Sequence, residues 1–442
     1  MFVFSQENNF NKGKIIDSVL VNIGSKESLS LYLPNQFNPT ELSPIVFIFD
    51  PMARGKIGIH PFIKTAEKYG YILICSNDSK NGPHELNIEI TNRLFNKIFT
   101  DFNIDKKRIY TAGFSGGSRL ASTIAVLTDQ IQGVVACGAG FSLSKNHMPH
   151  KDSFSYAAIV GDEDMNYREM INTKDFLNKL KVSNELFIFE FNHSWPSQKQ
   201  ILKAFDWLQL EAYKKSIIPT NDEHIKNSYT NFYKKARAFE KENKLLQASD
   251  IYDKILRNFR IYFKLDSIAY KIEKLKKNKS YKKEKKLLQS SFNEEILLTN
   301  KFVKHFNEDI NDNSQNLTWW KSEINKLKKN LIKATPIKKK MLRRLQYKIF
   351  ALSIETVNYR DIVEHIDQSI FCYDICILIY PKYHFLYFKQ IENYINKNNE
   401  LLALDYLEKL INTGYNDFQK IKEYKAFKSL KNNERFQQLI KS

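Results

Sequence analysis

Residues 110–122 read YTAGFSGGSRLAS, and this stretch decides the fold that the sequence predicts. A β-branched and aromatic run enters it, a helix-favouring run leaves it, and Gly113, Ser115 and Gly117 alternate between the two. This is the G-x-S-x-G pattern of a nucleophile elbow, a sharp strand-to-helix turn that exposes a serine hydroxyl. The turn strains the serine backbone, and a Cβ atom at either flanking position would collide with neighbouring chain. The next amide, of Gly116, points with the helix dipole toward the place where an oxyanion would form.

The segments on both sides of this stretch alternate between predicted strands and helices, which is typical of an α/β fold with a mostly parallel sheet. Residues 45–49 form a continuous apolar run, as expected for a strand that is buried on both faces. Residues 15–21 and 29–33 alternate in polarity and predict a first antiparallel pair. Further strands are expected at residues 71–75, 133–137, 156–160 and 186–191.

A G-x-S-x-G pattern also fits an ordinary turn rich in glycine and serine, so its interpretation depends on an acid and a histidine later in the chain. Asp164 follows the predicted strand 156–160, and His193 follows the strand 186–191. The order Ser, Asp, His is that of α/β hydrolases, and both loops would lie at the same edge of the sheet. Asp162, two residues away, is the alternative acid.

These residue types in this order suit acyl transfer. His193 would remove the proton from Ser115 during attack on an acyl carbon, and Asp164 would fix the imidazole tautomer. The Gly116 amide and one amide from the loop at residues 50–55, most plausibly that of Met52, would hold the oxyanion. Other candidates fit less well: Glu163 points elsewhere in an extended loop, and His147 and His150 are out of chain order.

Residues 12–212 resemble the α/β-hydrolase superfamily, and within it the polyhydroxybutyrate-depolymerase and feruloyl-esterase-like branch. Three motifs carry the resemblance: Gly113-Phe114-Ser115-Gly116-Gly117, Gly161-x-x-Asp164 and His193-x-Trp195-Pro196. The resemblance implies a serine esterase or related acyl hydrolase that needs no metal or other cofactor. Members commonly carry His-Gly after the third strand, where this chain has Asp50-Pro51, and proline has no amide to donate.

The charge of the chain is divided unevenly, which marks a domain boundary. Residues 1–212 carry 22 basic and 22 acidic side chains, so the whole net charge of +19 lies after residue 212. We expect a catalytic domain at 1–212, a linker at 213–223 and a helical domain at 224–442. Small and aromatic residues near 236–252 and 403–407 occur at positions similar to those of tetratricopeptide repeats. Such a domain would bind a protein partner; the alternative is a helical platform that packs on the hydrolase.

The cysteines, the apolar runs and the N-terminus bear on metal binding, membrane insertion and compartment. Cys372 and Cys376, with His384 nearby, make a poor zinc site and are expected to be core residues. No apolar run is long enough for a membrane span. Residues 1–6 are too short and uncharged for a signal peptide, so the chain is expected to be cytoplasmic, or exported if these residues end a longer signal.

The sequence therefore predicts a serine hydrolase of carboxylic esters fused to a helical-repeat region. A serine peptidase with the same triad and a non-catalytic scaffold on the hydrolase fold are the alternatives. Nucleic-acid binding by the basic half is a further hypothesis, although interleaved lysines are more typical of a solvated helical surface.

Overall fold

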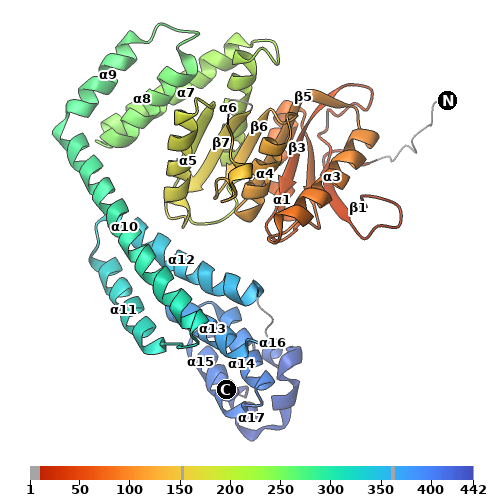
Figure 1. Ribbon diagram of the computed structural model, residues 1–442, viewed down its shortest axis with the longest axis vertical. Coiled ribbons are helices and arrows are strands. Elements are labelled where there is room, and N and C mark those ends of the chain that lie inside the picture. The colour runs from red at the N-terminus through yellow and green to blue at the C-terminus, as the bar shows by residue number, and fades with distance from the viewer. Residues whose placement is uncertain (1–9, 151–153, 360–363, 442) are drawn as a thin grey trace. The chain divides into compact units, whose positions relative to one another are not determined.

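The structure is a computed structural model that describes residues 10–150, 154–359 and 364–441. The chain divides into two compact units, Met1–Lys286 and Leu287–Ser442. The first unit holds a sheet with helices on both faces and further helices after it, whereas the described part of the second unit is helical (Figure 1). Residues 1–6, on which the expectation about the compartment rests, lie outside the described residues.

Within the described residues, eight strands form one sheet in the order β1-β2-β4-β3-β5-β6-β7-β8. The strands from β3 onward pair in parallel, and β1 and β2 pair antiparallel as the sequence predicted. The bounds are β1 (Ile15–Leu20), β2 (Ser28–Tyr32), β3 (Ser43–Phe49), β4 (Ile72–Ser76), β5 (Ile104–Phe114), β6 (Gly133–Cys137), β7 (Ser155–Gly161) and β8 (Asn184–Phe189). The predicted fold class, an α/β hydrolase fold followed by an all-α region, is confirmed.

Helices cover both faces of this sheet, which explains why β3 is apolar throughout. Val46 and Ile48 belong to the core on one face, together with side chains from α1 (Gly55–Ile59), η1 (His60–Phe62), α2 (Ile63–Tyr69) and α6 (Gln198–Lys214). Phe47 points to the other face, where its ring lies 4.0 Å from that of Phe95. That face carries α3 (His84–Asp101), α4 (Gly116–Leu127) and α5 (Tyr167–Lys179). A short helix, η2 (Lys145–His147), lies in the loop after β6.

The helices that follow the sheet belong to both compact units. The first unit includes α7 (Asp222–Lys241), α8 (Leu245–Phe259) and α9 (Asp266–Lys277), and α10 (Lys279–Asn311) continues into the second. The second unit contains α11 (Leu317–Lys333), α12 (Pro336–Tyr359), α13 (Ile366–Ile379), α14 (His384–Asn396), α15 (Glu400–Asn412), α16 (Phe418–Glu423), η3 (Lys425–Asn432) and α17 (Glu434–Leu439). Residues 213–223 hold the end of α6 and the start of α7, and the limits of the independently folding domains stay a prediction.

Two helix hairpins of the chain, α7–α8 and α14–α15, turn in the same way. Asn243 and Asn398 each occupy the middle of the turn with a φ of 55°. In both turns the next residue donates its amide to a carbonyl five residues earlier, from Lys244 to Phe239 and from Asn399 to Tyr394. Asparagine tolerates this left-handed conformation better than most residues, which explains its use at both helix ends.

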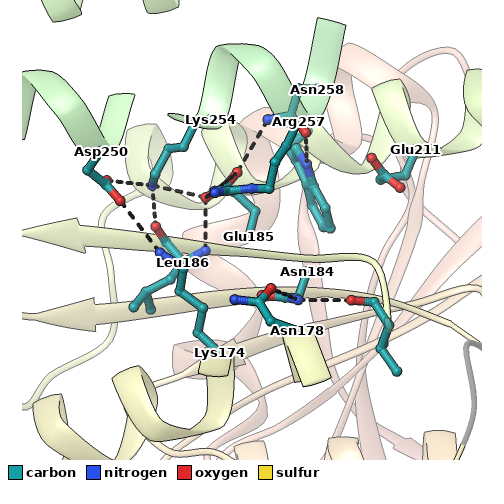
Figure 2. Close-up of polar contacts among 12 residues, drawn as sticks. Lys174, Asn178, Asn184, Glu185, Leu186, Glu211, Asp250, Lys254, Arg257 and Asn258 are labelled. Atoms are coloured by element: carbon teal, nitrogen blue, oxygen red, sulfur yellow. Dashed lines mark hydrogen bonds and ion pairs between the residues drawn. The ribbon is translucent and has the colours of Figure 1, made fainter. Parts of the chain in front are cut away.

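Helix α8 covers β8, the strand at the end of the sheet (Figure 2). The buried Glu185 of β8 pairs with Lys254 Nζ at 3.0 Å and with the Arg257 guanidinium at 3.3 Å. Lys254 also donates to the Leu186 carbonyl, a backbone group of the kind that an edge strand leaves unpaired. Its third partner, Asp250, lies 3.5 Å away. The helix therefore binds the edge strand through buried charged groups as well as through apolar contacts.

Mutual attraction keeps these buried groups ionised. Burial raises the pKa of the Glu185 carboxyl, but the charges of Lys254 and Arg257 outweigh it, so the pKa is lowered overall. Burial likewise lowers the pKa of Lys254, whereas the charges of Asp250 and Glu185 raise it, with a raised pKa as the result. Removing one partner would leave the other charge buried without compensation, which is costly.

We therefore expect Lys254→Met to lower the free energy of unfolding by about 3–5 kcal/mol, as loss of one member of a buried ion pair does. Urea denaturation measures the change. The matched control is Lys276→Met on α9, because Lys276 and Asp253 are 3.6 Å apart and both well exposed. Such surface pairs contribute about 0–1 kcal/mol.

The double variant Glu185→Gln/Lys254→Met removes both charges and should recover part of the loss. Because the folded pKa of Glu185 is below its unfolded value of about 4.3, its stabilising contribution is present above that pH and is lost as the pH falls through the folded pKa. Glu185→Gln should flatten this acid-side dependence. A Lys254→Met variant as stable as the unaltered protein would contradict the assigned role.

Candidate active site

The turn between β5 and α4 has the backbone that the elbow pattern predicted. Ser115 adopts a φ of 52° and a ψ of −119°, a conformation that costs a residue other than glycine about 1–3 kcal/mol. A Cβ on Gly113 would lie 2.2 Å from the Gly117 carbonyl oxygen, and one on Gly117 would lie 2.0 Å from that of Phe49. Glycine at both positions is therefore required by contact with backbone that cannot move aside.

Ser115, His193 and Asp164 lie in one chain of hydrogen bonds, although 78 residues separate the first two along the sequence. His193 Nε2 is 3.0 Å from Ser115 Oγ, and His193 Nδ1 is 2.9 Å from Asp164 Oδ2. The other oxygen of Asp164 accepts the Asn166 amide at 2.8 Å, which fixes the carboxylate. Asp164 is buried, and the Phe114 ring packs beside the imidazole with centroids 4.6 Å apart.

The strands explain why these three side chains meet. Ser115 follows β5, Asp164 follows β7 and His193 follows β8, and all three strands are parallel, so their carboxyl ends share one edge of the sheet. The Ser115 amide donates to the Cys137 carbonyl of β6 at 2.8 Å and ties the elbow to the strand between them. At Gly161 a Cβ would lie 2.0 Å from the Phe191 carbonyl oxygen, so glycine lets the two loops approach.

The other predicted candidates occupy different places. The carboxylate that contacts His193 Nδ1 belongs to Asp164, whereas the alternative acid, Asp162, uses its amide to bond the Phe189 carbonyl at 2.9 Å. The Glu163 amide bonds the Phe191 carbonyl. His147 contacts Ser142 Oγ through Nδ1 at 2.7 Å, and His150 is exposed in the same loop.

The two predicted oxyanion donors differ in the hydrogen bonding of their backbone amides. Gly116 is the first residue of α4, where an amide has no acceptor within its own helix. The Met52 amide instead donates to Asp50 Oδ1 at 2.9 Å. The Met52 side chain is 65% exposed.

Asp50 is a site residue whose role the sequence did not predict. Its buried carboxylate accepts Arg54 Nε at 2.9 Å, Arg54 Nη2 at 3.0 Å and Trp195 Nε1 at 2.8 Å. Burial raises the pKa of this carboxyl, but the hydrogen bonds from Arg54 and Trp195 lower it by more than burial raises it. The pKa is therefore lowered overall, and the group stays ionised. Since Trp195 is two residues beyond His193, Asp50 joins the loop after β3 to the histidine loop. The sequence signals were the Asp50-Pro51 departure and the His193-x-Trp195 motif.

A second ion pair joins the opposite side of the site. Arg119, one helical turn after Ser115, forms a two-pronged pair with Glu169 of α5 at 2.7 and 2.8 Å. Arg119 also donates to the Phe141 carbonyl, and Glu169 accepts the Gly140 amide, so the loop after β6 is fixed between two helices. Spacing along the sequence does not indicate this pair.

We expect Trp195→Phe to lower the free energy of unfolding by about 1.5–3 kcal/mol, the range for a hydrogen bond to a charged group. The substitution keeps an aromatic ring against Phe62 and Phe114 but removes the donor to Asp50. Urea denaturation measures the loss. Trp319→Phe serves as control, because no described residue accepts a hydrogen bond from the Trp319 indole. Equal stability of Trp195→Phe and the unaltered protein would count against the role of Asp50.

No protein-family model matches the sequence, and no curated protein matches it significantly. The chain is similar in structure to S-formylglutathione hydrolase from Staphylococcus aureus, with 16% identity and a TM-score of 0.37 over 44% of this chain and 95% of that one. It is also similar to the feruloyl esterase module of Clostridium thermocellum (13% identity, TM-score 0.37, 43% and 86% covered) and to an esterase of Pyrobaculum calidifontis (14%, 0.37, 47% and 87%).

No helix among the described residues is both long and apolar enough to cross a membrane. Likewise, the described residues hold no group of three or more metal-binding side chains.

Proposed function

We propose that the protein is a serine hydrolase that cleaves carboxylic esters through an acyl-enzyme. The observation that carries the proposal is the unbroken sequence of contacts from Ser115 Oγ to His193 Nε2 and from His193 Nδ1 to Asp164 Oδ2. Both distances lie within hydrogen-bond range, as a nucleophile and its base require. The strained backbone of Ser115 adds support, because such strain is concentrated at functional sites.

The reaction follows from these positions. His193 Nε2 takes the proton of Ser115 Oγ as the oxygen attacks the acyl carbon, and the carbonyl electron pair moves onto its oxygen. Collapse of this intermediate breaks the bond to the leaving alcohol, which receives the proton from His193. Water then repeats both steps on the acyl-enzyme and releases the acid. Asp164 holds the imidazole in the required tautomer and stabilises its charged form, and the Gly116 amide receives the oxyanion. The mechanism uses no metal or cofactor.

The test compares two isosteric variants of neighbouring acids. Asp164→Asn should lower kcat for p-nitrophenyl esters by about 10⁴-fold, because the wrong histidine tautomer is favoured, as in other triads. Asp162→Asn should keep most of the activity. A fluorophosphonate probe should label the intact protein and not Ser115→Ala.

Equal labelling of Ser115→Ala would exclude Ser115 as the nucleophile, and an intact protein that the probe leaves unlabelled would exclude the hydrolase. Loss of activity in Asp162→Asn instead of Asp164→Asn would mean that Asp162, and not Asp164, is the acid of the triad. Hydrolysis of peptide amides as well as esters would favour the peptidase alternative.

We further propose that the helical region binds a protein partner through divergent tetratricopeptide-like repeats. The matching turns at Asn243 and Asn398 support this interpretation. So do the buried alanines of the second helix in each hairpin, Ala248 in α8 and Ala403 in α15, which occupy the same position relative to the turn asparagine.

If partner binding is the role of the second unit, its removal should leave ester hydrolysis intact. We expect residues 1–286 to hydrolyse p-nitrophenyl esters with the kcat of the full chain, because the described catalytic contacts all lie within the first unit. Residues 1–212, which lack α8, should be unstable because Glu185 would lose Lys254 and Arg257. A large fall in kcat for residues 1–286 would show that the second unit takes part in catalysis.

A further inference from the structure

The loop after β3 has no backbone amide left for an oxyanion. Pro51 carries no N–H. The next four amides donate to protein oxygens: Met52 to Asp50 Oδ1 at 2.9 Å, Ala53 to Asp50 O at 3.1 Å, Arg54 to Asp50 Oδ1 at 3.3 Å and Gly55 to Asn77 Oδ1 at 3.1 Å. An oxyanion in this site therefore needs a second donor from another segment.

Asp50 is held too firmly to release these amides. Its carboxylate is buried and is bound by the Arg54 guanidinium and the Trp195 indole, with donor–acceptor distances of 2.8–3.0 Å. Turning the Met52 amide toward a substrate would leave one oxygen of this buried anion with fewer donors. Hydrogen bonds to charged groups are stronger than those between neutral groups, so moving the Met52 amide away from Asp50 has a cost.

Asn81, in the loop between β4 and α3, lies directly against the elbow. Its Oδ1 is 1.8 Å from the position that a Cβ on Gly116 would occupy, and its Nδ2 is 3.3 Å from that position. A Cβ at residue 116 would therefore displace the carboxamide from this position. Among the residues that the structure describes, no hydrogen-bond partner is present for the Asn81 side chain, which is exposed to solvent. A polar group is thus available beside Gly116.

The backbone around Asn81 is fixed, as a preorganised donor requires. The Asn81 amide donates to the Pro51 carbonyl at 2.9 Å. The buried side chain of Asn87 contacts both polar groups of the Lys80 backbone, accepting its amide at 3.2 Å and donating to its carbonyl at 2.8 Å. Asn87 also donates to the Pro83 carbonyl at 3.2 Å. The loop therefore holds its position while the terminal carboxamide can rotate.

We propose that the Asn81 carboxamide is the second oxyanion donor, acting beside the Gly116 amide in the esterase reaction proposed above. A half-turn about the terminal side-chain bond exchanges Oδ1 and Nδ2 and presents the NH₂ group to the developing negative charge. As Ser115 Oγ bonds to the acyl carbon and the carbonyl electrons move to oxygen, that oxygen receives one hydrogen bond from Gly116 and one from Asn81. A side-chain donor thus takes the place of the amides that Asp50 retains.

The test measures two reactions of Ser115: its phosphonylation by a fluorophosphonate and its turnover of p-nitrophenyl acetate. Loss of one oxyanion donor lowers kcat by about 10²–10³-fold in other serine hydrolases, and we expect this loss for Asn81→Ala with little change in KM. Asn81→Asp, of equal size, should lose at least as much because its carboxylate repels the oxyanion. Asn146→Ala, an exposed residue of η2, is the matched control and should react at the rate of the unaltered protein.

Gly116→Ala provides a second, independent variant. It keeps the backbone amide, but its methyl group occupies the place of the Asn81 carboxamide. We expect Gly116→Ala to lower both rates as much as Asn81→Ala does, and the double variant to lower them no further, because both changes remove the same hydrogen bond. Independent roles for the two residues would instead give additive losses.

The outcomes separate this inference from the proposed function. An unaltered protein that neither reacts with the probe nor hydrolyses the ester would overturn both. A reactive unaltered protein, with Asn81→Ala and Asn81→Asp at the same rates, would overturn the assignment of Asn81 alone. A loss of activity that appears only as a higher KM, with kcat unchanged, would also overturn the assignment of Asn81.

Discussion

The strained backbone of Ser115 is the constraint on which the rest of this site depends. Its φ of 52° costs about 1–3 kcal/mol and persists only because the surrounding chain allows no alternative. The turn must pass close to the Gly117 and Phe49 carbonyls, and it is tied to β6 through Cys137. These contacts join the elbow after β5 to both neighbouring strands, to β3 through Phe49 and to β6 through Cys137, and so fix Ser115 at the edge of the sheet.

Asp50 has a comparable influence on the loops around the elbow. As a buried anion it collects the amides of its own loop, the Arg54 side chain and the Trp195 indole. These bonds fix the histidine loop relative to the loop after β3, and they also occupy the backbone donors of the loop after β3. A backbone amide that holds Asp50 in place therefore cannot also donate a hydrogen bond to another group. In the oxyanion site proposed above, the Asn81 carboxamide beside Gly116 takes the place of these amides.

The helices after the sheet contribute to the same rigidity. β8 leads directly into the loop of His193, and it is an edge strand, so its exposed side requires a partner. Lys254 of α8 provides it by pairing with Glu185 and bonding the Leu186 carbonyl. The helical region is therefore divided: its first hairpin, α7–α8, belongs to the same compact unit as the sheet, whereas the hairpin around Asn398 belongs to the second unit.

The sequence by itself determined the fold class, the elbow and the grouping of Ser115, Asp164 and His193 at one sheet edge. Those features follow from near-neighbour sterics at Gly113 and Gly117, from the apolar runs of the buried strands and from the order of the loops. Only the tertiary structure decided that Met52 bonds to Asp50, that Asn81 lies on Gly116 and that α8 belongs with the sheet. Each of these depends on which polar atoms meet across segments distant in the chain, and the choice of hydrogen-bond partner is not encoded in local pattern.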